Sequence, residues 1–361
     1  MKTSHRVATV VGGAIGLAAT GAAIAITAAK RRDAKGSLEE KLGLLEPDRV
    51  RSVTLEDGVE ISVEEVDPAD GGRPELTLVY VHGFAVSRKC WHFQRRDLAA
   101  STSPRVRQVL FDLRCHGLSS RGVAASCTIE QLARDLSAVL KSVVPAGPIV
   151  LVGHSMGGMT IMALAEQEPT LFADRIRGAV LIATSAGELG RRGLPRPLLS
   201  RYNPVTRGVG RLAGWRPGLV EYVRAAGGGI TRRAVRSLAF GHRDVSPGLV
   251  DFLVEMLAVT PVGVLTDFAD TFGTHNRYAA LAGLRPVHVL VISGDEDLIT
   301  PFPHAERMAE ELPDAELVRA RGAGHMVMLE QPALVNDHVR LLLQQCVYGL
   351  GAARRKWWRR A

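Results

Sequence analysis

Aromatic residues and cysteines are scarce in this sequence of 361 residues. Phe, Trp and Tyr make up 5% of it, and the four cysteines stand far apart, at positions 90, 115, 127 and 346. This spacing is not that of the disulfide framework of a small secreted protein, and no Cys or His pairs occur at zinc-ligand spacing. No repeat period is visible, which argues against a solenoid. The cysteines are therefore interpreted as buried or incidental thiols, which favours a reducing compartment.

The overall composition is that of a globular protein. Hydrophobic residues make up 46% of the sequence and charged residues 23%, so a disordered chain is excluded. A chain of this length can bury one large α/β core and carry one insertion.

A long uncharged run lies near the N-terminus. Val7–Ala29 contains 23 residues without a charge, which is enough for a helix that crosses a bilayer. We therefore expect residues 1–36 to form an uncleaved transmembrane anchor and a basic linker. The heavier positive charge after the run predicts that the globular domain lies on the cytoplasmic side. Two alternatives stay open: a secretory signal cleaved near Ala23-Ile24-Ala25, with a secreted or extracytoplasmic product, and a soluble or peripheral segment.

Beyond this segment, apolar runs alternate with helical patterns. Asp57-Gly58, between two alternating stretches, predicts an antiparallel hairpin with a two-residue turn. Six apolar runs then predict strands at Leu76–Val81, Val106–Phe111, Ile149–Gly153, Ala179–Ala183, Val287–Ser293 and Ala315–Val318. Five stretches predict helices near Trp91–Leu98, Ile129–Val143, Met156–Gln167, Pro303–Leu312 and Pro332–Gln345. This order predicts an α/β fold with a mostly parallel sheet covered by helices on both faces.

The alternation stops between about Glu188 and Arg285. This stretch is helical in pattern and is broken by several prolines, so we interpret residues 188–285 as a helical lid inserted over the sheet. The core then comprises residues 37–187 and 286–350, and residues 351–361 form a basic tail that contains tryptophan.

The segment Gly153-His154-Ser155-Met156-Gly157 lies between an apolar run and a helical pattern. A serine flanked by glycines at a strand-to-helix junction is the nucleophile-elbow pattern, because the tight turn exposes the hydroxyl and glycines avoid clashes of Cβ atoms. Alone the pattern is weak, and an ordinary glycine-rich turn is the alternative.

Polar residues also follow the other predicted strands. His82-Gly83-Phe84 follows the first, and Asp112 to Ser119, Gly294 to Pro301 and Gly322 to His325 follow three others. The carboxyl ends of parallel strands meet at one edge of the sheet, where sites form. A nucleophilic serine needs a base to take its proton and a carboxylate to orient that base. The loops offer a serine, an acid and a histidine in that order.

On these motifs, the region from about Arg51 to Tyr348 resembles the α/β-hydrolase family, with a lid inserted after the sixth strand. The resemblance implies Ser155 as nucleophile, His325 as general base and acid, and Asp297 as the orienting carboxylate. Family members place this acid three residues after a glycine and ahead of a proline, as in Gly294-x-x-Asp297-x-x-x-Pro301. Two alternative acids are Asp295 and Glu188.

The resemblance also implies an oxyanion hole built from the backbone N–H groups of Phe84 and Met156. Supporting roles are expected for the residues around it, with His82 bracing the oxyanion loop and His154 packed beneath the elbow: His82, Gly83, Gly153, His154 and Gly157. In one respect the sequence departs from the family, because the segment that usually reads Asp-x-Arg-Gly-His-Gly-x-Ser has Cys115 in place of its first glycine. No metal site is expected.

A serine at the elbow suits acyl transfer, whereas related epoxide hydrolases and dehalogenases carry aspartate there. The expected activity is hydrolysis of a carboxylic ester, of the carboxylesterase or lipase type, through an acyl-enzyme on Ser155 and without a cofactor. A thioesterase, an acyltransferase and a cofactor-free haloperoxidase or perhydrolase would use the same three residues. A non-catalytic binding protein with a hydrolase fold is the alternative from another class.

Positive charge is concentrated in three segments. From Glu188 to Arg243 there are twelve arginines and two glutamates, and both the N-terminal 36 residues and the tail Arg354–Arg360 are basic. Basic residues beside paired tryptophans suit a membrane surface, although lid arginines that merely solvate helices are an equal alternative. We expect membrane lipid and a small lipophilic acyl ester as partners and no nucleic acid. The sequence leaves the oligomeric state open.

Overall fold

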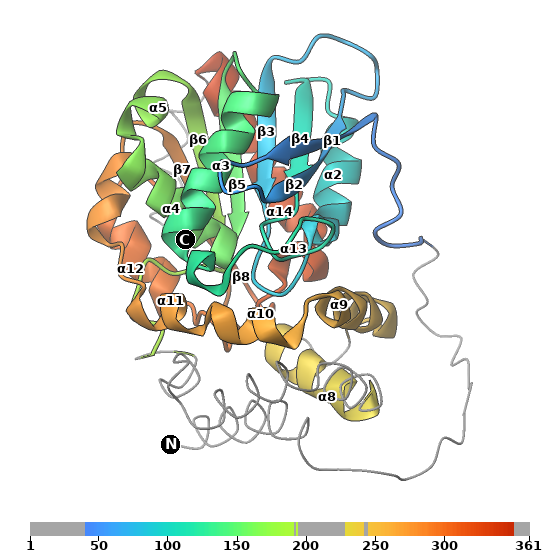
Figure 1. Ribbon diagram of the computed structural model, residues 1–361. Helices are drawn as coiled ribbons and strands as arrows, with labels where there is room; N and C mark the ends of the chain where they lie inside the picture. The colour runs from blue at the N-terminus through green and yellow to red at the C-terminus, as the bar shows by residue number, and fades with distance from the viewer. Residues whose placement is uncertain (1–39, 191–192, 194–227, 242–244, 350–361) are drawn as a thin grey trace.

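The computed structural model describes residues 40–190, 193, 228–241 and 245–349 (Figure 1). The expected membrane anchor and the basic tail lie outside these residues, as does most of the arginine-rich part of the lid, so these assignments and the domain boundaries stay predictions. Among the described residues, no single helix has the length and hydropathy of a membrane span. The pair Pro247–Val259 and Val262–Thr274, bent by 84°, meets these two criteria when its halves are taken together.

The described core is built on an eight-stranded sheet with the strand order β1-β2-β4-β3-β5-β6-β7-β8. The first two strands are antiparallel to their neighbours, and all the others pair in parallel. The strands are β1 Arg49–Thr54, β2 Glu60–Val66, β3 Leu76–Val81, β4 Val106–Phe111, β5 Ile149–His154, β6 Ile176–Ile182, β7 His288–Gly294 and β8 Glu316–Ala320. The mostly parallel sheet predicted from the sequence is confirmed.

Helices cover both faces of this sheet (Figure 1). One face carries α3 Ile129–Val143, α4 Met156–Gln167, α5 Pro169–Asp174 and α12 Pro303–Glu311. The other face carries α2 His92–Ala99, preceded by the 3₁₀ turn η1 Arg88–Trp91, together with α13 Val327–Glu330 and α14 Pro332–Tyr348.

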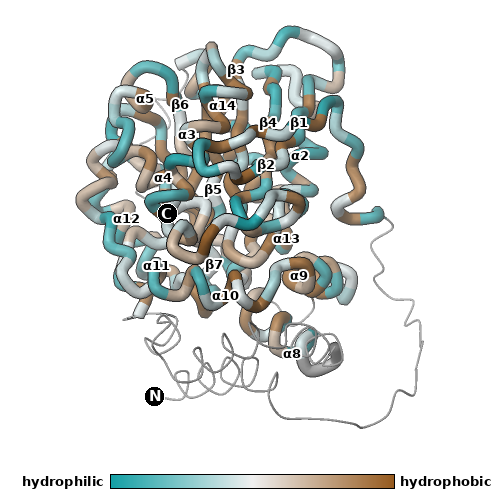
Figure 2. The backbone as a smooth tube through the Cα atoms, in the orientation of Figure 1, coloured by the Kyte–Doolittle hydropathy of each residue, from teal (hydrophilic) through white to brown (hydrophobic). Residues whose placement is uncertain are grey.

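Alternate residues of each central strand enter opposite cores. On β3, Val79 and Val81 pack on the side of α3 and α4, whereas Leu78 and Tyr80 pack on the side of α2 and α14. This follows from the two-residue period of a strand, and it explains why the central strands are apolar throughout. Figure 2 shows hydrophobic residues along these strands and more hydrophilic residues in the connecting turns.

The described helices between β6 and β7 lie across one end of the sheet (Figure 1). They are α8 Gly228–Ala239, α9 Pro247–Val259, α10 Val262–Asp267 and α11 Ala269–Thr274, followed by the 3₁₀ turn η4 Ala279–Leu284. Thr260, after α9, donates its hydroxyl to the carbonyl of Ala85, which follows β3. These helices therefore cover the carboxyl ends of the parallel strands, where the loops with the candidate site residues gather.

One sequence prediction about the hairpin is wrong. The loop between β1 and β2 has three residues and not two. The Leu55 N–H donates to the Val59 carbonyl, so these two residues are still paired, and the Gly58 N–H donates to the Leu55 carbonyl and closes the turn. Gly58 has a φ of 79°. A left-handed glycine at this place is typical of a three-residue hairpin loop with a bulge.

Candidate active site

Ser155 lies on the turn between β5 and α4 and has a left-handed backbone, with φ 51° and ψ −116°. A residue with a side chain rarely adopts this conformation, and such strain is held by surrounding contacts. The Ser155 N–H donates to the carbonyl of Ile182 at 2.9 Å, and its own carbonyl accepts the Thr184 hydroxyl at 2.7 Å. The turn is therefore fixed to the end of β6, with Ser155 as its central residue.

The glycines around Ser155 are required by close backbone contacts. A Cβ atom at Gly157 would lie 2.0 Å from the carbonyl oxygen of Val81. A Cβ atom at Gly83 would lie 2.5 Å from Nδ1 of His154 and 3.2 Å from Cβ of Ser155. Real Cβ atoms essentially never come within 3.0 Å of such an atom, so the loop after β3 can contact the serine turn this closely because both positions are glycine.

The predicted acid and base are brought together on neighbouring loops. Nδ1 of His325, after β8, lies 2.8 Å from Oδ2 of Asp297, after β7. The other carboxylate oxygen of Asp297 accepts the backbone N–H groups of Ile299 and Thr300 at 2.8 and 2.9 Å. Asp297 is 3% exposed and His325 6% exposed. The carboxylate is thus fixed by its own turn and holds one nitrogen of the imidazole.

His154 links this pair to the serine turn. Its Nε2 donates to the carbonyl oxygen of His325 at 3.0 Å, and the two rings have centroids 4.8 Å apart. Because His154 directly precedes Ser155, this contact places the His325 loop beside the serine. Burial and, to a smaller extent, the nearby His325 hold the pKa of His154 well below its usual value. His154 is therefore a neutral hydrogen-bond donor.

Two backbone amides beside the serine are available to bind an oxyanion. Met156 is the first residue of α4, where an N–H has no acceptor within its helix. Within the part of the chain that the structure describes, neither the Phe84 nor the Met156 N–H has an acceptor. The helix N-terminus adds positive potential at Met156. Both amides predicted from the sequence thus lie on the loops that meet at Ser155.

His82 is fully buried and holds the start of the loop after β3. Its Nε2 accepts the Leu113 N–H at 2.9 Å, so its Nδ1 carries the proton that is donated to the Gly83 carbonyl at 2.7 Å. Burial lowers the pKa of His82 to about 4. His82 is therefore neutral, and it braces the loop that carries Phe84 rather than exchanging protons with a substrate.

The aromatic ring of Phe84 joins the same loop to the lid. Its centroid lies 5.1 Å from that of Phe272 in α11 and 5.8 Å from that of Phe268, which follows α10. It also lies 5.9 Å from the ring of His116, which is itself 5.6 Å from the ring of Phe268. Burial is the main cause that lowers the pKa of His116 to about 3, so this ring is uncharged. The described lid thus contributes apolar aromatic surface next to the candidate oxyanion loop.

Of the two alternative acids, Asp295 is used elsewhere. Its carboxylate accepts the backbone N–H of Gly322 at 2.6 Å, which closes the turn before His325. Glu188 begins the lid with a φ of 60°. The carboxylate that contacts the imidazole of His325 is that of Asp297.

Sequence reasoning missed two residues of this site. The hydroxyl of Thr300 donates to Oδ2 of Asp297 at 2.8 Å and lies 3.4 Å from Nδ1 of His325. A signal for it was present, because an Asp followed at the third position by a Thr and then a Pro is typical of a turn closed by the Asp side chain. Glu330 is the second missed residue, and no local pattern marks its contact with the lid because its partner there, Gly241, is 89 residues away.

Glu330 fastens the His325 loop to the lid. One carboxylate oxygen accepts the N–H of Gly324 at 2.8 Å, and the other accepts the N–H of Gly241, after α8, at 2.9 Å. The Met326 N–H also donates to the carbonyl of Ala239 at 3.0 Å. The lid chain is therefore joined to this part of the core by two hydrogen bonds, and Glu330 also holds the loop that carries the base.

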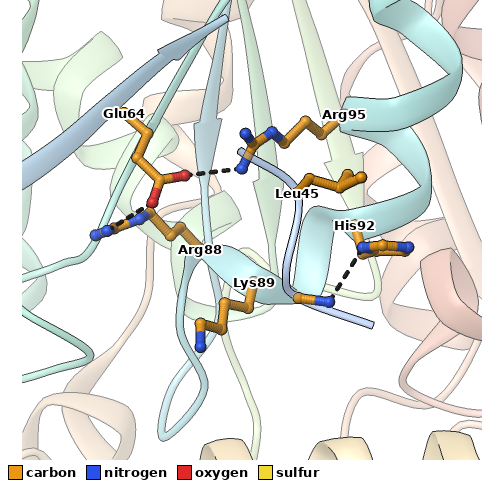
Figure 3. Close-up of a pocket in the computed structure, with 7 residues that line it drawn as sticks. Leu45, Glu64, Arg88, Lys89, His92 and Arg95 are labelled. Atoms are coloured by element: carbon orange, nitrogen blue, oxygen red, sulfur yellow. Dashed lines mark hydrogen bonds and ion pairs between the residues drawn. The ribbon is translucent and has the colours of Figure 1, made fainter. Parts of the chain in front are cut away.

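A small cavity of about 30 Å³ lies outside this site (Figure 3). It lies between β2 and η1–α2, and Figure 3 shows Glu64 between Arg88 and Arg95 at its edge. This volume suits an ordered water rather than an organic substrate. No cluster of three or more His, Cys, Asp or Glu side chains that could hold a metal ion is found among the described residues.

Comparisons with known proteins find a matching family and similar sequences. The sequence model described as the alpha/beta hydrolase family matches residues 78–338. The uncharacterized hydrolase YugF of Bacillus subtilis is 25% identical over 300 residues, which cover 80% of this chain and 96% of that protein. The dihydrolipoyllysine-residue acetyltransferase component of an acetoin cleaving system of Pseudomonas putida is 27% identical over 275 residues, which cover 76% of this chain and 65% of that protein.

Solved structures give the same result. A thermophilic esterase from Thermogutta terrifontis shares 26% identity with a TM-score of 0.63, and the match covers 83% of this chain and 99% of that structure. An enol-lactonase from Burkholderia xenovorans, 22% identical, matches in fold with a TM-score of 0.62 over 81% of this chain and 99% of that structure.

Proposed function

This chain belongs to the α/β-hydrolase family, and from that premise we propose that it is a serine esterase that cleaves carboxylic esters through an acyl-enzyme on Ser155. The observation that carries the proposal is the 2.8 Å hydrogen bond between Asp297 and Nδ1 of His325, on loops beside the strained serine turn. An imidazole held in this way has its Nε2 lone pair free to take a proton.

In the first half of the reaction, the Ser155 oxygen bonds to the carbonyl carbon of the ester while its proton passes to Nε2 of His325. The carbonyl oxygen becomes an oxyanion and accepts the N–H groups of Phe84 and Met156. When this intermediate collapses, the bond to the alcohol oxygen breaks and His325 gives its proton to the leaving alcohol. Asp297 stabilises the transient imidazolium without taking the proton.

In the second half, water replaces the alcohol. The water oxygen bonds to the acyl carbon while His325 takes a proton from the water. The N–H groups of Phe84 and Met156 hold the second oxyanion. Collapse breaks the bond to Ser155, which regains its proton from His325, and the carboxylic acid leaves. A thiol leaving group, or an alcohol or peroxide in place of water, would use the same residues.

The neighbours and the lid support an ester of lipophilic character. The similar structure from Thermogutta terrifontis is described as an esterase. The partly exposed aromatic rings of Phe84 and Phe272 form apolar surface beside the candidate oxyanion amide, and the fully buried Phe268 packs against Phe84. Such a wall favours an apolar acyl or alcohol group over a charged one.

The decisive experiment combines a fluorophosphonate probe with p-nitrophenyl esters of two to sixteen acyl carbons. We expect the probe to label the intact protein at Ser155, and Ser155→Ala to lose the label and about 10³-fold or more in kcat while it stays folded. Ser52→Ala, on the edge strand β1, is the matched control and should keep full activity. An active Ser155→Ala protein would defeat the assignment. Absence of labelling, with a known serine esterase labelled alongside, would favour a non-catalytic binding protein.

We also propose attachment to the inner face of a membrane through residues 1–36. The support is the uncharged run Val7–Ala29, the basic residues after it and the exposed arginines of α8, Arg232, Arg233 and Arg236. In fractionated cells the full chain should remain in membranes after alkaline extraction, and a chain lacking residues 1–36 should be released. A full-length protein that is wholly soluble would refute the anchor.

A further inference from the structure

Two cysteines that the proposed reaction does not use face each other in the loop between β4 and α3. The Sγ atoms of Cys115 and Cys127 lie 3.8 Å apart in a thiol–thiol hydrogen bond. Cys115 is 5% exposed and Cys127 1% exposed. A disulfide needs an S–S distance of about 2.05 Å, so oxidation would have to bring these two facing sulfur atoms closer together.

The backbone at Cys115 is unusual for a residue with a side chain. Its φ is 67°, in the left-handed region where glycine is favoured and other residues cost about 1 kcal/mol. Its N–H donates to the carbonyl of Ser120 at 3.0 Å, which fixes this turn. A glycine at this position would relieve the strain. The presence of a side chain there in spite of the strain points to a function of that side chain.

The surroundings activate one of the two thiols. The pKa of Cys115 is lowered, chiefly by its hydrogen bond with the Cys127 thiol, and the positive charges of Arg114 and Arg121 act in the same direction. The pKa of Cys127 is raised, because the same hydrogen bond and burial both favour its protonated form. A thiolate that faces a protonated thiol is the arrangement from which disulfides form.

We propose that Cys115 and Cys127 are a redox-active dithiol that closes to an intramolecular disulfide on oxidation by a small hydroperoxide such as hydrogen peroxide. The Cys115 thiolate attacks one peroxide oxygen, the O–O bond breaks, and the protonated hydroxide leaves as water. The resulting sulfenic acid is then attacked by the sulfur of Cys127, the S–O bond breaks, and a second water leaves. In total, two thiols and one hydrogen peroxide give one disulfide and two waters.

The disulfide would close a loop that is fastened to the lid. Between the two cysteines, Arg121 pairs with Asp267 of α10 at 2.9 Å. Just after them, the N–H of Ile129 donates to the hydroxyl of Thr271 in α11 at 3.0 Å. A bond between the cysteines removes freedom from this loop in the unfolded chain and so stabilises the folded state.

The test uses the full chain, reduced and then treated with hydrogen peroxide. Peptide mapping should find Cys115 and Cys127 linked with the loss of two hydrogen atoms, and dithiothreitol should reverse the link. The melting temperature should rise by about 5 °C on oxidation. Cys115→Gly, which suits the local backbone, should show neither change, and Cys346→Ala should show both.

Three results would overturn the proposal: Cys115 and Cys127 still reduced after peroxide treatment, a sulfinic acid formed in place of the link, or a link to another cysteine. None of these readouts depends on catalysis, so they stand or fall separately from the esterase assignment.

Discussion

Replacing Asp297 by asparagine removes one charge and leaves the shape of the site unchanged. The asparagine oxygen can occupy the position of Oδ1 and keep the hydrogen bonds from the N–H groups of Ile299 and Thr300, now 2.8 and 2.9 Å long. Its NH₂ group then takes the position of Oδ2, which lies 2.8 Å from Nδ1 of His325. The turn should therefore survive, and the folded protein should accumulate normally.

The change reverses the hydrogen bond on which the base depends. An NH₂ group donates, so Nδ1 of His325 must accept and the proton of the neutral ring moves to Nε2. In this tautomer, Nε2 has no lone pair with which to take the proton of Ser155. The imidazolium that forms in the transition state also loses its carboxylate. A carboxylate-to-amide change in such a triad reduces kcat by about 10⁴, which corresponds to about 5 kcal/mol of transition-state stabilisation.

The measurement is kcat on a p-nitrophenyl ester for the wild type, Asp297→Asn and a matched control. Asp295→Asn serves as the control, because Asp295 lies two residues away and its carboxylate binds the Gly322 N–H and not the imidazole. It should stay within a few-fold of the wild type. If Asp297→Asn kept more than a tenth of the wild-type kcat, or if Asp295→Asn lost as much activity, the assignment of the orienting carboxylate would be wrong.

Two further predictions concern stability. Burial lowers the pKa of His82 and His275 to about 4 and that of His116 to about 3, whereas the unfolded chain takes up these protons near pH 6.5. The free energy of unfolding is therefore highest above pH 6.5, and between pH 6.5 and 5 it should fall by about 1.4 kcal/mol per pH unit for each histidine. A free energy of unfolding in urea that does not change with pH in this window would contradict the prediction. Gly157→Ala should lower the free energy of unfolding by about 3 kcal/mol or more, because the added Cβ would lie 2.0 Å from the Val81 carbonyl oxygen. If the variant unfolded at the same temperature as the wild type, the structure would have relaxed around the new Cβ and the prediction would be wrong.

Sequence patterns predicted the elements with clear local signals most accurately. The bounds of α3 and α4 agree with the expected ranges Ile129–Val143 and Met156–Gln167. Helix α3 begins after Thr128, whose hydroxyl accepts the Gln131 N–H at 3.1 Å, a cap that is readable from the sequence. Helix α14 continues three residues beyond the expected Gln345 and ends before Gly349, with φ 63°. That glycine was an available stop signal, since left-handed glycines commonly end helices.

Contacts between distant segments were beyond the reach of the sequence. The expected strand Ala179–Ala183 begins at Ile176 in the structure, because β6 pairs with β5 from Ile149 onward although Arg177 and Gly178 interrupt the apolar run. Pairing with a neighbour, and not the residues themselves, extends this strand.

The parts of the candidate site also differ in whether a sequence pattern predicts them or a contact between distant segments is needed. The strand-end loops placed Ser155, Asp297 and His325 at one edge because parallel strands share a direction. The bond from Glu330 to Gly241 depends instead on how the lid returns to the core, and nothing in the local sequence around either residue encodes it.

The contacts of the lid bear on how substrate preference and rate are related. The aromatic residues of the lid pack on Phe84, whose amide is a candidate oxyanion donor, and Glu330 holds both the lid at Gly241 and the loop that carries His325. A displacement of the lid therefore moves both the amide that would bind the oxyanion and the imidazole that would act as base. Both groups must be positioned to within a fraction of an ångström for catalysis. It follows that substitutions in the lid should change kcat as well as KM, even where they do not touch the ester.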